Sequence, residues 1–439
     1  MPEFFNVLPP DQARELLFEQ ITRVLPAETM ATTDALGRIT AVPITAPHAL
    51  PNFRRSTMDG YAVRAADTFG ASESLPAFLT VIGEVSMGQG TDLVLQTGQA
   101  AIVHTGGMIP DTADAVIQIE HTQVISEHPP LPTRHSPSHS DGPTRQAVLT
   151  APLAPPFEIE LLRAVAPGQN VLQVGEDVQP QAEILPAGHR LRPQDIGGLL
   201  ALGLTEVAVV RQPRVAILAT GDEVIAPDQM PAPGQIRDIN SYTIAAQTIQ
   251  AGGLPRLGGI IGDKLAALQK AAAAALAEAD MLVMSAGSSV SVRDMTVQVI
   301  EQLGQPGVLL HGVATRPGKP TIVGAAGGKP VLGLPGNPVS AMIQFDMFGV
   351  PAIYRLQGLA APPRRGSIWA TLTQNIASES GREDYIPAQV TDTPAGPQAT
   401  PVFGKSNLIY TLVNADGLIQ VPLNKAGLTA GESVMVRLF

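Results

Sequence analysis

The sequence predicts a multidomain α/β protein whose central domain has a mostly parallel sheet. Between residues 180 and 355, short apolar runs alternate with helical patterns, which is typical of βαβ units with helices on both faces of the sheet. On either side of this region, short β-rich pieces are separated by Gly and Pro. These flanking regions predict smaller β domains.

The composition bounds the class of protein. The chain has 439 residues, of which 44% are hydrophobic and 15% charged, enough for several buried cores and too apolar for a disordered chain. Its 42 Gly and 40 Pro predict many tight turns, and the absence of Cys excludes disulfides and thiolate chemistry. The net charge of −11 argues against binding to nucleic acid or to an anionic membrane.

The first 180 residues contain one helical pattern and then mainly β-rich sequence. Residues 10–24 have apolar residues at helical spacing, with Asp11 as a candidate N-cap. The N-terminus lacks the pattern of a signal peptide, and no apolar run reaches the ~18 residues of a membrane span. We therefore expect a soluble, cytoplasmic protein. Residues 126–145 are rich in Pro, Ser and His and predict a long loop.

The central region resolves into strands and helices. Buried strands are predicted over 214–220, 280–287 and 307–314, and a hairpin over 321–334. A helix is predicted over 240–253, capped by Asn240 or Ser241 and ended by Gly252. From about residue 362 onward, short β pieces predict a small all-β module.

Four of the predicted strands are followed by polar or glycine-rich turns. In an open parallel sheet, ligands bind beyond the carboxyl ends of the strands. The residues at these ends that we single out are Gly221, Asp222, Gly287, Ser288, Ser289, Asp294, Arg316, Gly318, Lys319, Pro335, Gly336, Asn337 and, one turn into the next helix, Ser340. Each motif alone is also compatible with an ordinary turn, but their convergence at one edge favours a site.

The residue types at these turns point to a phosphate ester. Backbone N–H groups at helix starts, hydroxyls and the cations Arg316 and Lys319 suit a tetrahedral oxyanion. Asp222 and Asp294 would repel such an anion unless a hard cation such as Mg²⁺ lay between them. The sequence therefore predicts a magnesium-bridged phosphate ester at this edge.

Other motifs are weaker or absent. The turns at 56–64 and 105–107 are polar candidates in the β-rich region. His135 and His139 are four residues apart but lie in the polar loop, where solvation is a better interpretation than zinc. The sequence contains no G-x-S-x-G, Walker A or G-x-G-x-x-G motif.

Seven motifs together resemble one family. MDGYAVR, TGGMIP, GEDV, TGDE, GQIRDIN, RPGKP and LPGNPVSA occur between residues 58 and 341 in an order and spacing similar to the molybdopterin molybdenumtransferases, the MoeA type related to the gephyrin E domain. The resemblance implies four parts: a discontinuous linker domain (1–45 and 147–179), a β-rich inserted domain (46–146), a molybdopterin-binding α/β domain (180–355) and a C-terminal β-barrel-like domain (362–439). It also implies a homodimer with an active cleft shared between subunits.

The activity implied by the resemblance is the insertion of molybdate into adenylylated molybdopterin with Mg²⁺, which releases AMP and molybdenum cofactor. Other implied partners are a molybdopterin adenylyltransferase or the enzymes that accept the cofactor. The implied catalytic residues are Asp59, Thr105, Asp222 and Lys319. The implied metal-handling residues are Glu176, Asp222 and Asp294. The implied substrate-binding residues are Gly221, Asp238, Gly287, Ser288, Ser289, Arg316, Gly318, Pro335, Gly336, Asn337 and Ser340.

Three positions depart from the family pattern, and two alternatives stay open. Ala286 and Ser291 stand where the family often has Gly, and Arg316 where Lys is frequent. One alternative is an adenylyltransferase, which shares the α/β module but is usually a single domain. The other is a non-enzymatic cofactor store or scaffold.

Overall fold

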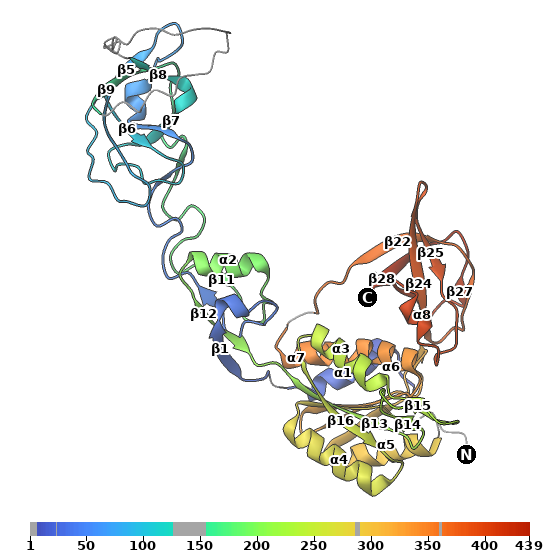
Figure 1. Ribbon diagram of the computed structural model, residues 1–439. Helices are drawn as coiled ribbons and strands as arrows, with labels where there is room; N and C mark the ends of the chain where they lie inside the picture. Colours follow the sequence, from blue (N-terminus) through green and yellow to red (C-terminus); the bar gives the residue numbers. More distant parts are fainter. Residues whose placement is uncertain (1–6, 23, 126–154, 286–289, 360–361) are drawn as a thin grey trace, which may run out of the picture. The chain divides into compact units, whose positions relative to one another are not determined.

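A computed structural model shows the fold of the chain (Figure 1). It describes residues 7–22, 24–125, 155–285, 290–359 and 362–439, so the predicted loop at 126–145 lies outside the described residues. The chain forms two compact units, Met1–Pro43 with Leu185–Phe439, and Ile44–Ile184. Within the described residues, no helix combines the length and apolar character that a membrane crossing requires.

The unit of residues 44–184 is built on one six-stranded sheet. Its strand order is β7-β4-β6-β5-β9-β8. The bounds are β4 Gly60–Val63, β5 Ala77–Glu84, β6 Gln99–Val103, β7 Ala115–Gln118, β8 Thr122–Ile125 and β9 Phe157–Leu161. Strand β4 is buried along its whole length. A Cβ on Gly60 would lie 2.0 Å from the Ile117 carbonyl oxygen, so only glycine fits at the start of this strand.

Two strand pairings cross the domain bounds that the resemblance implies. Strand β9 pairs with β5 and β8, so Phe157–Leu161 belongs to the inserted sheet and not to the linker predicted at 147–179. Instead, β1 (Ala27–Ala31) pairs with β12 (Glu206–Val210), a segment predicted to be part of the α/β domain. Helix α2 (Pro193–Ala201) precedes β12. Short alternating strands carry no signal of their partner, so these pairings do not follow from the sequence pattern.

The central sheet confirms the predicted α/β class. Its order is β16-β13-β17-β21-β20-β18, in which β16, β13, β17 and β21 are parallel and β20 and β18 complete an antiparallel edge. The bounds are β13 Arg214–Thr220, β16 Leu254–Ile261, β17 Met281–Ser285, β18 Pro306–His311, β20 Ile322–Ala326 and β21 Lys329–Leu334. Strands β20 and β21 form the predicted hairpin.

Both faces of this sheet are covered by helices, which explains the unbroken apolar runs of its strands (Figure 1). Along β13, Val215 and Ile217 join one core with α1, α3, α6 and α7, whereas Ala216 and Leu218 join a second core with α4 and α5. The bounds are α1 Pro10–Gln20, α3 Asn240–Gln250, α4 Leu265–Glu278, α5 Val290–Leu303, α6 Pro338–Gln344 and α7 Val350–Leu356.

Several helix ends differ from the sequence prediction. Helix α1 begins at Pro10, so Asp11 lies in its first turn and is not its N-cap. Helix α3 begins at Asn240, and the Asp238 carboxylate accepts a hydrogen bond from the Ser241 N–H at 3.0 Å, so Asp238 takes the capping role. Between α6 and α7, the π-helical turn η4 (Phe345–Gly349) joins the two helices into one helical segment that ends at Leu356.

The C-terminal module closes into a barrel. Its strands follow the order β24-β25-β22-β28-β26, and β26 pairs back onto β24. The bounds are β22 Ser367–Leu372, β24 Glu383–Thr393, β25 Gly396–Pro401, β26 Gly417–Val421, β28 Ser433–Leu438 and the short helix α8 Tyr410–Val413. A two-residue strand of the α/β domain, β19 (Thr315–Arg316), joins the edge of this module in parallel with β24.

Smaller elements complete the chain. They are β2 Ile44–Thr45, β3 Arg55–Ser56, β10 Val171–Leu172, β11 Glu183–Leu185, β14 Val224–Ile225, β15 Ile236–Arg237, β23 Ile376–Ala377, β27 Gly427–Leu428 and the 3₁₀ turns Thr32–Asp34, Ala65–Thr68 and Ile119–His121.

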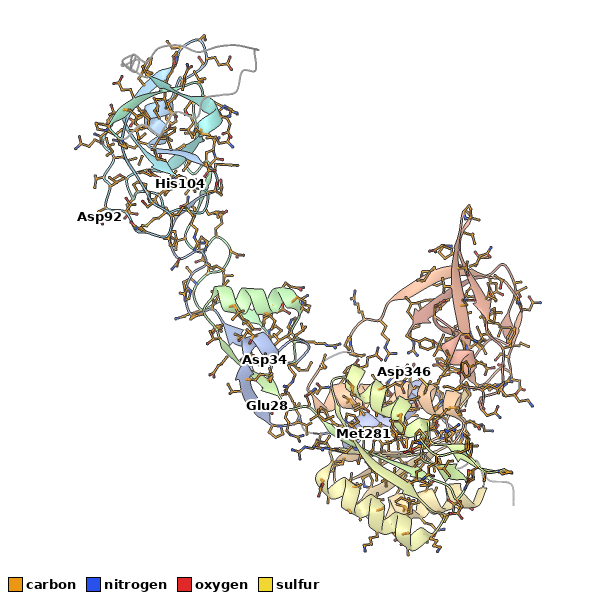
Figure 2. All side chains as sticks on the ribbon, viewed as in Figure 1. Glu28, Asp34, Asp92, His104, Met281 and Asp346 are labelled. Carbon is orange, nitrogen blue, oxygen red and sulfur yellow. The ribbon has the colours of Figure 1, made fainter. Side chains whose placement is uncertain are left out.

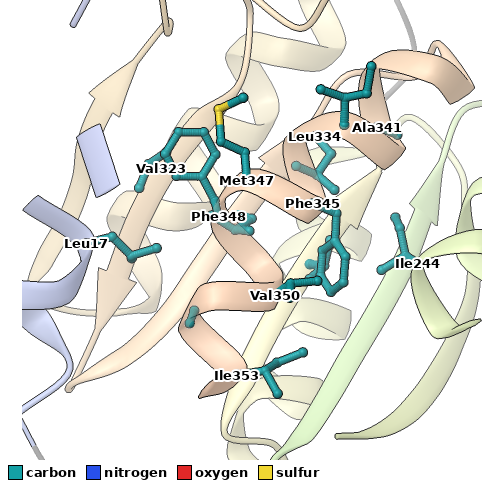
Figure 3. Packing of buried hydrophobic residues seen from close by; sticks show 14 of the residues in the cluster. Leu17, Ile244, Val323, Leu334, Ala341, Phe345, Met347, Phe348, Val350 and Ile353 are labelled. Carbon is teal, nitrogen blue, oxygen red and sulfur yellow. The ribbon is translucent and has the colours of Figure 1, made fainter. Parts of the chain in front are cut away.

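The α/β domain and the barrel share one hydrophobic core. Phe345 and Phe348 of η4 are fully buried among α1, α3 and β21, as the labelled side chains in Figure 3 show. Leu412 and Leu418 of the C-terminal module belong to the same cluster. The burial of this cluster therefore fixes where the barrel lies against the carboxyl edge of the sheet.

Phe345→Ala is expected to lower the free energy of unfolding by about 3–5 kcal/mol, because it empties the centre of this shared core. Phe69→Ala, at a side chain that is 63% exposed, is the control and is expected to change it by less than about 1 kcal/mol. Urea unfolding measures both. A loss at Phe345 no larger than at Phe69 would show that this core does not hold the two parts together.

Candidate active site

The carboxyl ends of four strands meet at one edge of the central sheet. Strands β13, β17 and β21 are parallel, and β18 runs in the same direction because it is antiparallel to β20, which is antiparallel to β21. Gly221 and Asp222 follow β13, and Pro335, Gly336 and Asn337 follow β21. The sequence prediction that these turns share one edge is thus confirmed. Gly287, Ser288 and Ser289 lie outside the described residues.

A cavity of about 350 Å³, here called the recess, opens beside β13 and α3. Its polar lining residues are Thr220, Glu223, Arg237, Asp238, Asn240, Ser285, Asn337 and Asn407. The exposed Arg237 donates a hydrogen bond from Nε to the Gln229 carbonyl oxygen at 3.1 Å. The buried polar residues of the lining supply carboxylate, amide and hydroxyl groups.

The Asn240 side chain links three elements that line the recess. Its Nδ2 donates to Ser285 Oγ at 3.0 Å and to the Gly336 carbonyl oxygen at 2.8 Å, which ties α3 to the ends of β17 and β21. Its Oδ1 is buried and accepts no hydrogen bond from the described part of the chain. Leaving a buried acceptor without a hydrogen bond lowers the free energy of unfolding by about 1–3 kcal/mol. The position of the Asn240 amide therefore reduces the stability of the fold.

A second cavity of about 700 Å³, here called the cationic pocket, lies between the α/β domain and the barrel. Arg316 and Lys319 line it from the turn after β18, and Arg382 and Lys405 line it from the barrel. Ser340, only 3% exposed, contributes a hydroxyl from α6. Four cations around one cavity in a chain of net charge −11 mark a site for an anion.

Gln344 supports the turn that carries Arg316 and Lys319. This side chain is completely buried, and its Nε2 donates to Thr315 Oγ1 at 3.0 Å and to the Pro317 carbonyl oxygen at 2.9 Å. A Cβ on Gly318 would lie 2.3 Å from Gln344 Nε2, and the φ of Gly318 is +108°. Only glycine allows the turn to lie this close to the amide.

Asp384 anchors two of the cations. Its side chain is fully buried, and Oδ1 accepts from Arg382 Nε at 2.9 Å, while Oδ2 lies 3.7 Å from Arg316 Nη1. The Arg316 side chain is 61% exposed, so its guanidinium keeps donors for a ligand. The pairing of β19 with β24 places Arg316 opposite Asp384.

Acidic side chains gather at the end of β13. Asp222 Oδ1 accepts a hydrogen bond from the Asp263 N–H at 3.0 Å. Burial, together with the negative charges of Asp222 and Glu223, raises the pKa of Asp263 above its ordinary value. Asp263 Oδ1 is buried and has no hydrogen-bond donor among the described residues. A cation beside Asp222 and Asp263 would relieve this repulsion.

The residues of the predicted metal set, Glu176, Asp222 and Asp294, are divided between the two units of the chain. Glu176 lies in the unit of residues 44–184, where its carboxylate accepts from the Gln173 N–H at 2.7 Å. Asp294 is exposed on α5. Within the described ranges, no three Asp, Glu or His side chains are close enough to hold one metal ion. The neighbour that Asp222 does have is Asp263.

Asp59 and Thr105 meet on the surface of the other unit. Asp59 Oδ1 accepts from the Thr105 N–H at 2.8 Å. This backbone hydrogen bond, with help from the Thr105 hydroxyl and from His104 (labelled in Figure 2), lowers the pKa of Asp59 below its usual range. Both residues are exposed, so the structure presents an ionised, oriented carboxylate on this unit.

Comparison with known proteins gives the family. The MoeA N-terminal region (domain I and II) matches residues 8–203, the probable molybdopterin binding domain matches 216–355, and the MoeA C-terminal region (domain IV) matches 370–439. The molybdopterin molybdenumtransferase of Bacillus subtilis is 33% identical over 94% of this chain and 89% of its own length. The chain belongs to the molybdopterin molybdenumtransferase family. It is therefore an enzyme of molybdenum cofactor biosynthesis.

Further relatives agree over the full length. The molybdopterin molybdenumtransferase of Haemophilus influenzae is 31% identical, with 98% of each chain covered. The solved molybdopterin biosynthesis protein MoeA of Pyrococcus horikoshii OT3 is 30% identical, covers 99% of this chain and 100% of its own, and superposes with a TM-score of 0.81. A match across all regions argues against the single-domain adenylyltransferase alternative.

Several residues that shape the site, among them Gln344, Asn240, Asp263, Arg382 and Lys405, were not predicted as site residues from the sequence. Gln344 sits in an apolar helical run, and Asn240 was interpreted only as a cap. Arg382 and Lys405 come from the barrel, far along the chain from the strand ends. A polar side chain at a position predicted to be buried, as at Gln344, is the one signal that was available.

Gln344→Met is expected to weaken molybdate binding by about 10-fold or more. The turn carrying Arg316 and Lys319 then loses the hydrogen bonds that Gln344 Nε2 donates to Thr315 Oγ1 and to the Pro317 carbonyl oxygen. Isothermal titration with molybdate measures this. Gln357→Met is a matched control, since Gln357 is 2% exposed and donates to the Ala251 and Ile353 carbonyl oxygens. Both variants are expected to lose stability, but only Gln344→Met loses affinity; equal affinities would contradict a positioning role.

Proposed function

We propose that this enzyme inserts molybdate into adenylylated molybdopterin and releases AMP and molybdenum cofactor. The observation that carries the proposal is the cationic pocket, where Arg316, Lys319, Arg382 and Lys405 surround about 700 Å³ at the carboxyl edge of the sheet. Molybdate is a tetrahedral dianion, and the substrate's phosphoanhydride is also anionic. Ser340 and the guanidinium of Arg316 supply directional donors for such oxygens.

The recess adjoins this pocket and extends the site. Asn337 lines both cavities, and its Nδ2 donates to Ser406 Oγ at 2.9 Å. One substrate molecule can therefore occupy both cavities. Catalysis by positioning and by stabilising charge at the phosphoanhydride fits these side chains, and no covalent enzyme intermediate is needed.

Mg²⁺ fits the acidic pair at the end of β13. Asp263 has an unsatisfied carboxylate oxygen and a raised pKa next to Asp222, which is the environment that a hard cation stabilises. Mg²⁺ is usually held by one or two carboxylates together with substrate phosphates, so two protein ligands suffice. We propose that Asp222 and Asp263 hold the ion, which neutralises charge on the phosphoanhydride.

We also propose that the enzyme acts as a homodimer in which Asp59 and Thr105 of one subunit complete the site of the other. The exposure of both residues, and the hydrogen bond that fixes the Asp59 carboxylate, support a role toward a ligand or a partner subunit. A carboxylate held ionised on the surface is suited to orient a metal-bound water or a reacting group.

Asp59→Ala is expected to reduce molybdate-dependent AMP release by at least about 100-fold while leaving the fold intact, because it removes an oriented carboxylate from the site. The measurement uses purified enzyme, adenylylated molybdopterin, molybdate and Mg²⁺, and follows AMP and cofactor. Asp92→Ala, at an exposed residue of the same unit labelled in Figure 2, is the control.

The same assay tests the function itself. Wild-type enzyme is expected to release AMP and form cofactor only when molybdate is present. Tight substrate binding without turnover would instead support the cofactor store or scaffold alternative. Wild-type rates in Asp59→Ala would remove Asp59 from the site.

A further inference from the structure

The two exposed residues Asp59 and Thr105 are connected through a buried serine. Ser56 ends strand β3 shortly before Asp59 in the chain and is only 1% exposed. Buried hydroxyl groups in folded proteins have hydrogen-bond partners, so the partners of Ser56 show which segments it holds.

The Ser56 hydroxyl closes the turn that leads to Asp59. Its Oγ donates to the Met58 carbonyl oxygen at 2.5 Å and accepts a hydrogen bond from the Met58 N–H at 3.2 Å. On the other side of this turn, the Asp59 carbonyl oxygen accepts from the Ile119 N–H at 3.2 Å. The backbone of Asp59 is therefore fixed both before and after its side chain.

The Ser56 backbone holds the turn that carries Thr105. The Gly106 N–H donates to the Ser56 carbonyl oxygen at 2.8 Å, and the Ser56 N–H donates to the Gly107 carbonyl oxygen at 2.9 Å. Thr105 immediately precedes these glycines, and its N–H donates to Asp59 Oδ1 at 2.8 Å. One buried residue therefore contacts both the turn of the donor and the turn of the acceptor.

We propose that Ser56 is a positioning residue, whose hydroxyl holds the Asp59 carboxylate against the Thr105 N–H in the geometry that the reaction uses. The inference rests on the proposed function, in which Asp59 acts on the substrate.

The ionisation of Asp59 depends on the geometry that Ser56 holds. The hydrogen bond from the Thr105 N–H is the main cause that lowers the pKa of Asp59. Removal of the Ser56 hydroxyl frees the turn before Asp59 and weakens this bond. The pKa of Asp59 then rises toward its ordinary value.

The neighbouring charges do not depend on the Ser56 hydroxyl. His104 also lowers the pKa of Asp59 by its charge, and His104 Nε2 lies 2.7 Å from Glu84 Oε1 on β5. This pair stays in place when Ser56 loses its hydroxyl. A change in the titration of Asp59 therefore reports on the turn that Ser56 closes.

Ser56→Ala in the full chain tests the inference. NMR of isotope-labelled aspartate carboxyl groups follows the titration of Asp59, whose signal is identified by its loss in Asp59→Asn. We expect Asp59 to titrate at higher pH in Ser56→Ala than in wild type, because the hydrogen bond that favours its ionised form is weakened.

The pH profile of AMP release measures the consequence for the reaction. The Asp59 carboxylate acts in its ionised form, so activity is lost as the pH falls through its pKa. We therefore expect the acid limb of kcat/KM to move to higher pH in Ser56→Ala. The misplaced carboxylate is also expected to lower kcat/KM about 10- to 100-fold at neutral pH.

Thr68→Val is the matched control. Thr68 is another fully buried hydroxyl of the same unit, and its Oγ1 donates to the Ala65 carbonyl oxygen at 2.8 Å and accepts from the Val165 N–H at 3.0 Å. Ser56→Ala and Thr68→Val are both expected to lose stability, but only Ser56→Ala changes the titration of Asp59.

Ser56→Cys is measured beside Ser56→Ala and carries the test if the alanine variant does not fold. A thiol is a weak donor, so an intermediate shift in the titration of Asp59 is expected. Titration of Asp59 at the wild-type pH in the Ser56 variants, or an unchanged acid limb of AMP release, overturns the inference.

The proposed function fails separately from this inference. If Asp59 titrates at higher pH in Ser56→Ala but wild-type enzyme releases no AMP with molybdate, the positioning of Asp59 by Ser56 stands and the reaction assignment falls. If wild-type enzyme releases AMP and the titration of Asp59 is insensitive to Ser56, the reverse holds.

Discussion

The cationic pocket depends on the contact between Gln344 and the turn that carries Arg316 and Lys319. In a chain of net negative charge, an anion is attracted only where several cationic side chains are clustered in one place. Gln344 holds the turn from inside the protein through Thr315 and the Pro317 carbonyl oxygen, and Gly318 allows the close approach. A lysine on an unsupported surface loop would interact only weakly with nearby charges, because water screens them.

The shared core makes this arrangement possible. Two of the four cations belong to the α/β domain and two to the barrel, so the pocket exists only while these parts keep their separation. Phe345 and Phe348 pack with Leu412 and Leu418 of the C-terminal module in one cluster. The buried Asp384 adds a second link, because it pairs with Arg382 of its own module and lies 3.7 Å from Arg316. Burial of apolar side chains stabilises the contact between the α/β domain and the barrel, and the ion pairs fix how the two parts are aligned.

The elements that depend on the local residue pattern could be predicted from the sequence. Strand Arg214–Thr220 was predicted correctly because a strand buried on both faces is apolar throughout. The convergence of turns at one sheet edge follows from strand direction alone. The pairing of β1 with β12 was not predicted, since two five-residue strands contain nothing that specifies a partner about 180 residues away.

The local sequence pattern singled out residues of the cationic pocket only where they follow a predicted strand end. Arg316, Lys319, Asn337 and Ser340, which is one turn into α6, do so and line this pocket. Arg382 and Lys405 reach the same pocket through tertiary packing, which leaves no trace in local pattern. Asp263 likewise becomes a neighbour of Asp222 only because β13 and β16 are adjacent in the sheet.

Crystals soaked with tungstate would show whether the cationic pocket holds the substrate oxyanion. Tungsten gives a strong anomalous signal, and tungstate has the shape and charge of molybdate. We expect an anomalous peak within hydrogen-bonding distance of the side chains of Arg316 and Lys319, and we expect this peak to disappear in Gln344→Met. A tungstate peak bound elsewhere in the molecule, or a pocket that stays empty at saturating tungstate, would contradict it.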